Sequence, residues 1–136
     1  MPRAHHSSPS AADKRFMREH KDGLSPSTLR AKWIDEPGEG PDHDGQTLAT
    51  RNIEVIRAWA EARGGKPATS PGGDTEEPRV LRFDFPGYDS NLQEVSWEAW
   101  QSTFEERDLV FLFQETKADG KQSNFFRLDS PEREDG

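Results

Sequence analysis

The stretch VSWEAWQSTFEERDLVFLFQE, residues 95–115, decides the fold because a helical pattern is followed directly by a buried strand. Ser96 is a good N-cap for a helix over 97–107, which carries three large rings on one side. These rings are those of Trp97, Trp100 and Phe104. Residues 109–115 are apolar on both faces, as expected of a strand in the middle of a sheet.

The sequence on either side predicts the elements that this helix and strand pack against. An amphipathic helix is predicted over 49–63, ending at the left-handed cap Gly64-Gly65, and further strands at 66–71, 79–85 and 122–128. The turn between the last two strands of the chain is too short for a parallel crossover, so they pair antiparallel. The fold class predicted is α+β, with two helices packed on a small, three- to four-stranded, mostly antiparallel sheet and a flexible N-terminal arm.

Charge and apolar content divide the chain of 136 residues into three parts. Residues 1–47 are predicted to be a Pro/Gly-rich arm with a short docking helix at 26–34, and the arm is basic over residues 1–33, which carry a net charge of +4. Residues 48–128 are predicted to be the compact domain, because they contain seven of the eight Phe and three of the four Trp. Residues 129–136 are predicted to be a charged, disordered tail.

Several classes of protein are disfavoured by composition. The chain has no cysteine, so it forms no disulfide and no thiolate metal site, which fits a reducing compartment. No apolar run approaches the roughly 20 residues of a membrane span, and the N-terminus lacks the apolar segment of a secretory signal. We therefore expect an acidic, cytoplasmic protein that does not enter membranes.

Residue types that carry chemistry occur, but in unfavourable positions. All four histidines precede residue 48, and Asp42-His43-Asp44 has ligand types without a distant partner to complete a metal site. Gly64-Gly65-Lys66 follows a helix, whereas phosphate-binding loops precede one. The pair Glu76-Glu77 is expected on a solvated loop. No catalytic, cofactor-binding or metal-binding residue is predicted, so we expect no cofactor and no enzymatic activity.

Three binding hypotheses are left open. The first is a non-enzymatic protein-interaction module with an unknown partner, whose contact residues would be Trp97, Trp100 and Trp33. The second is weak nucleic-acid binding through the basic arm, with Arg15, Arg18, Lys21, Arg30 and Lys32 as contacts. The third is carbohydrate binding, if Trp97 or Trp100 lies on the surface.

Four segments carry a resemblance to known proteins. They read IRAWAEARGGKPAT, VLRFDFPGY, VSWEAWQSTFEERDLVFLFQE and QSNFFRLD. In these segments the chain resembles a group of small bacterial proteins without an established function, some of which carry the label of a glucan branching enzyme. A true branching enzyme is a much larger barrel protein, which 136 residues are too few to build. The resemblance therefore implies no catalytic residues.

Overall fold

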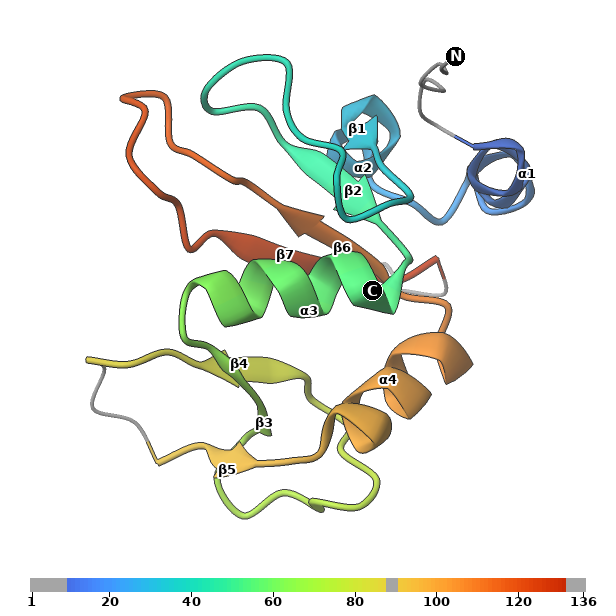
Figure 1. Ribbon diagram of the computed structural model, residues 1–136. Helices are drawn as coiled ribbons and strands as arrows, with labels where there is room; N and C mark the ends of the chain where they lie inside the picture. The colour runs from blue at the N-terminus through green and yellow to red at the C-terminus, as the bar shows by residue number, and fades with distance from the viewer. Residues whose placement is uncertain (1–9, 88–90, 132–136) are drawn as a thin grey trace. The chain divides into compact units, whose positions relative to one another are not determined.

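A computed structural model describes residues 10–87 and 91–131. The chain divides into two compact units. The first contains the described residues up to Val55 and from Leu109 onward, and the second is Ile56–Asp108 (Figure 1). The predicted α+β class is confirmed. The described residues form four helices and two mostly antiparallel sheets, where sequence analysis expected two helices on one sheet and a short docking helix in the N-terminal arm.

The elements of each unit can be followed by their labels in Figure 1. The first unit contains α1 (Ala11–Glu19), α2 (Pro26–Arg30), β1 (Lys32–Trp33), β2 (Leu48–Thr50), β6 (Val110–Phe113) and β7 (Phe126–Asp129). The second contains β3 (Lys66–Thr69), β4 (Arg82–Asp84), β5 (Gln93–Glu94) and α4 (Trp97–Glu106). Helix α3 (Ile53–Ala62) begins in the first unit and continues into the second. None of the described helices combines the length and the apolar character needed to cross a membrane.

The first unit is built on a four-stranded sheet in the order β1-β2-β6-β7. Strands β1 and β2 are parallel, and the other two pairs are antiparallel. The register places Trp33 beside Ala49 and Ala49 beside Leu112, so these side chains share one face of the sheet. Phe16 and Leu24 complete a buried cluster on that face. The central strand β6 is buried along its whole length, as its apolar sequence predicted.

The structure differs from the flexible arm that was expected over residues 1–47, of which 1–9 lie outside the described residues. Within this range α1, α2 and β1 belong to the first unit, and Phe16, Leu24 and Trp33 are buried. The helix expected over 26–34 is shorter than predicted: α2 ends at Arg30, and Lys32–Trp33 form strand β1. The physical reason is that a few large apolar side chains, spaced far apart, are enough to dock short elements on an exposed sheet face.

A buried polar network fixes α2 to the last strand of the same unit. Ser25 caps α2, and its backbone N–H donates to Asp129 Oδ2 at 2.9 Å. The Thr28 hydroxyl donates to the same oxygen. Asp129 is 1% exposed and ends β7, so the charged tail expected from residue 129 does not begin there. Residues 132–136 of that tail lie outside the described residues.

The second unit contains the three-stranded antiparallel sheet β4-β3-β5 and α4. The predicted cap is observed where α3 ends: Gly64 has a φ of 71°, and the Gly65 N–H donates to the Ala60 carbonyl at 2.8 Å. The predicted start of this helix is wrong, because Leu48–Thr50 form β2 and α3 begins only at Ile53. A strand of three residues is too short for its alternation to be recognised.

Aromatic side chains form the core of the second unit. Phe83 stacks on Trp100 with ring centroids 5.2 Å apart, and Trp100 stacks on Phe104 at 5.6 Å. Trp59 contacts Phe83 at 6.0 Å and meets Phe85 edge to face at 5.9 Å. All five rings are at most 9% exposed. Such pairs add about 0.5–1.5 kcal/mol each beyond the burial of their area, so these rings stabilise the fold.

Candidate functional site

A groove of about 1030 Å³ lies beside α4 in the second unit. One wall is the loop that precedes β4, and the other is the helix side turned away from the aromatic core. Its lining residues are Asp74, Glu76, Glu77, Pro78, Arg79, Val80, Ala99, Ser102, Thr103, Glu106 and Arg107. The groove therefore lies wholly within the second unit.

Hydrogen bonds hold the loop wall against the helix. The Thr103 hydroxyl donates to the Pro78 carbonyl at 2.7 Å, and Arg107 donates from Nη1 to the Arg79 carbonyl at 2.9 Å. At the far end of the loop, Asp74 Oδ1 accepts from the backbone N–H groups of Glu76 and Glu77. Because side chains bind backbone carbonyls across the two walls, the groove is held open in a defined shape.

The charge of the groove is predominantly negative. Four carboxylates line it against two guanidinium groups, and the guanidinium of Arg107 is bound to a carbonyl of the opposite wall. Val80 is 40% exposed and gives the groove an apolar spot. The whole second unit contains eleven acidic and six basic residues, a net charge of −5. This arrangement favours a positively charged ligand with some apolar surface.

The tryptophans proposed from the sequence as partner contacts lie mainly in the core. Trp33 and Trp100 are 2% and 0% exposed, and their indole N–H groups donate to the carbonyls of Thr28 and Arg82. Trp97 is half-buried, with the Arg57 guanidinium over its ring at 5.3 Å. Two of the three rings therefore cannot offer a face to a partner or a sugar in this conformation, because a fold of this size needs its large rings inside.

The five cations proposed as nucleic-acid contacts belong to the first unit and do not share one environment. Arg15, Arg18, Lys21 and Arg30 are exposed. Lys32 is half-buried and donates to Asp42 and to the Gly40 carbonyl, each at 2.8 Å. Hydrogen bonds from Lys32 and Gln46 hold the pKa of Asp42 below its usual value. Lys32 is thus engaged within the fold, and the nucleic-acid hypothesis rests on the other four.

The residue types considered for metal binding do not converge. Within residues 10–87 and 91–131, no group of three or more His, Asp and Glu side chains is placed to hold a metal ion. His43 binds the adjacent Asp44 carbonyl through Nδ1 at 3.0 Å, and Asp44 accepts from Thr116 at 2.9 Å. His5 and His6 lie outside the described residues.

The sequence did not identify the groove. Its acidic loop was interpreted as solvated surface, because neighbouring acidic residues such as Glu76 and Glu77 occur in any acidic protein. The signal that was present is the polar side of α4, where Ser102, Thr103 and Glu106 alternate with the core rings. Comparison of the chain with protein-family models, with curated proteins and with solved structures finds no match. The resemblance to the small bacterial group therefore stays a prediction.

Proposed function

We propose that this chain is a non-enzymatic, cytoplasmic protein-interaction module that binds a basic segment of a partner protein in the groove beside α4. The observation that carries the proposal is the groove itself, whose two walls are joined by hydrogen bonds and whose lining is mainly acidic. The absence of cysteine fits a reducing compartment. Preorganised walls favour binding because less ordering entropy is lost when the partner arrives.

An extended segment rich in Lys or Arg matches the lining. The aliphatic stem of such a side chain can pack on Val80 and Ala99, while its charged head reaches the carboxylates of Glu76, Glu77 or Glu106. Phosphate groups would be repelled by the same carboxylates, so a nucleic acid is a poor ligand for this unit. A segment of a protein, with both apolar stems and positive charge, is the chemistry that fits.

The acidic side chains are better suited to binding than to acid–base catalysis. A general acid and a general base need environments that drive their pKa values apart. Glu76, Glu77 and Glu106 are all exposed, and their loop and helix are open to water. Exposed carboxylates attract cations over a distance of about 8 Å at physiological ionic strength, and that attraction gives association rate and specificity.

The test is a titration of the full chain with fluorescein-labelled peptides. One peptide is rich in Lys and Arg. The control peptide has the same apolar residues, with Glu in place of each Lys or Arg. We expect saturable binding of the basic peptide only. The triple variant Glu76→Gln, Glu77→Gln, Glu106→Gln should weaken it about tenfold, since each exposed pair contributes about 0.2–1 kcal/mol.

The control is Glu105→Gln, which removes one carboxylate from the residue before Glu106. Glu105 is exposed on α4 and bound to Gln101, but it does not line the groove. We expect the control to bind the basic peptide within a factor of two of the original chain. Equal affinity for the acidic peptide, or an unchanged affinity in the triple variant, would refute the proposal.

A further inference from the structure

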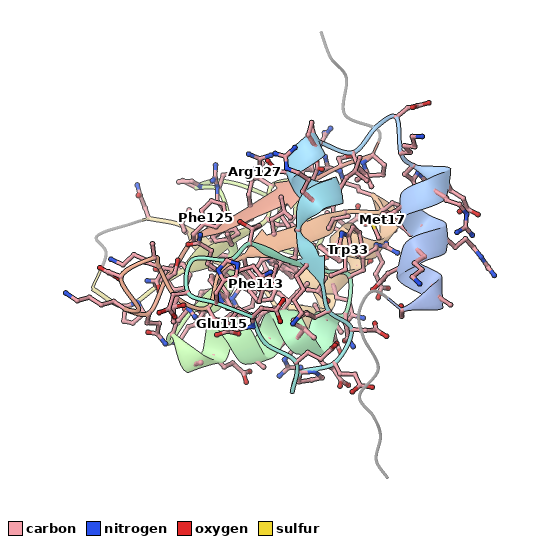
Figure 2. All side chains as sticks on the ribbon, turned by 90° about the horizontal axis from the view of Figure 1, so that it is seen from above. Met17, Trp33, Phe113, Glu115, Phe125 and Arg127 are labelled. Carbon is pink, nitrogen blue, oxygen red and sulfur yellow. The ribbon has the colours of Figure 1, made fainter. Side chains whose placement is uncertain are left out.

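Helix α1 packs on the four-stranded sheet of the first unit through one side. Phe16 is buried against Trp33, with ring centroids 6.2 Å apart, and belongs to the cluster that contains Val110 and Leu112. Figure 2 shows Met17 on α1 turned toward the strand that carries Trp33, and Met17 packs against the same cluster. Phe16 and Met17 therefore dock the helix on the sheet through apolar contacts.

An acidic side chain is buried on this packed side. Asp13, three residues before Phe16 and so on the same side of α1, is only 6% exposed. Its Oδ2 has no hydrogen-bond partner in the structure. An ionised carboxylate with an unsatisfied oxygen is costly to bury, whereas a neutral carboxyl group is much less so.

The groups around Asp13 come from three places in the first unit. Ser10 caps α1 and bonds to Asp13, Asp35 follows β1, and Arg51 follows β2 with its guanidinium 4.2 Å from the Phe16 ring centroid. His20 lies one turn after Phe16, and the centroids of the two rings are 4.4 Å apart. Burial and the charge of Asp35 raise the pKa of Asp13 to about 6, while Ser10 and Arg51 act in the opposite direction.

We propose that α1 is a proton-dependent latch, docked on the sheet while the Asp13 carboxyl is neutral and released as that carboxyl ionises. The direction follows from linkage. The docked state keeps the proton more tightly than the released state, so docking is strongest in acid and weakens as the pH rises from about 4 to about 6. Release uncovers the apolar side chains of Trp33, Val110 and Leu112. This inference concerns the first unit and is independent of the groove.

The experiment measures backbone hydrogen exchange of residues 11–19 in the full chain at pH 5 and pH 8, corrected for the pH dependence of chemical exchange. We expect protection of these amides to fall about tenfold over that interval, the change given by a carboxyl whose pKa moves from 3.8 to about 6. Constant protection from pH 5 to pH 8 would overturn the proposal.

Two variants separate Asp13 from other groups. Asp13→Asn keeps the shape and cannot ionise, so its protection should not change with pH. Glu19→Gln removes an exposed carboxylate from the same helix and should retain the tenfold change. An Asp13→Asn variant with the original pH dependence would overturn the proposal. Should that variant fail to dock α1, a carbon-13 titration of the Asp13 carboxyl in the original chain decides: a midpoint near 6 supports the latch, and one near 4 refutes it.

Discussion

Replacing Asp129 with alanine tests whether the N-terminal elements are part of the folded domain. Asp129 Oδ2 accepts from the Ser25 backbone N–H and from the Thr28 hydroxyl, and all three residues are buried. The variant leaves the Ser25 N–H in the interior without this acceptor, and the Thr28 hydroxyl keeps only the Ser25 hydroxyl, 3.0 Å away, as a partner. Hydrogen bonds to a charged group contribute about 1.5–3 kcal/mol each, so we expect a loss of about 3–5 kcal/mol in the free energy of unfolding.

The measurement is urea unfolding followed by far-ultraviolet circular dichroism. A loss of this size is a large fraction of the roughly 5–15 kcal/mol that stabilises a typical domain. Asp129→Asn retains an acceptor oxygen and should lose about 1–2 kcal/mol. Arg127→Ala, on an exposed position of the same strand, should stay within about 0.5 kcal/mol of the original chain. A loss below about 1 kcal/mol for Asp129→Ala would show that α2 is not fixed to β7.

Three further substitutions test the packing of both units. Gly23→Ala places a Cβ in steric conflict with the Pro131 carbonyl oxygen and should lower the free energy of unfolding in urea by about 1–3 kcal/mol. Gly38→Ala, with open space around the added Cβ, should be nearly neutral. Trp100→Ala removes the ring stacked between two phenylalanines and should cost about 3–5 kcal/mol, with loss of the near-ultraviolet circular dichroism signal. Thr103→Val removes the hydrogen bond to the Pro78 carbonyl and should weaken binding of the basic peptide severalfold. The unfolding transition of this variant should stay cooperative.

Local sequence signals predicted the long helices and the central strand. Ser96 caps α4 and accepts from the Ala99 N–H at 3.0 Å, as its position before the helix indicated. Gly64 ends α3 in the left-handed conformation. The apolar run after Asp108 became β6. These features depend on neighbouring residues, so their chemistry can be recognised along the chain.

The N-terminal elements could not be predicted in the same way. Their docking depends on contacts between residues that are far apart in sequence, such as Ser25 and Asp129 at a separation of 104 residues. Locally, Phe16 and Trp33 are isolated rings in a basic, polar stretch, which is typical of an arm. The groove is equally non-local, because its shape depends on the pairing of Thr103 with the Pro78 carbonyl.

The use of the aromatic side chains limits how this protein can recognise a partner. The second unit buries Trp59, Trp100 and the rings around them to form its own core, so little large apolar surface is left for an interface. The binding that we propose for the groove would then depend mainly on charge, which salt screens over about 10 Å at 0.1 M and about 3 Å at 1 M. An interface centred on buried aromatic anchors would be nearly insensitive to salt. The affinity of the basic peptide should therefore fall steeply with added salt.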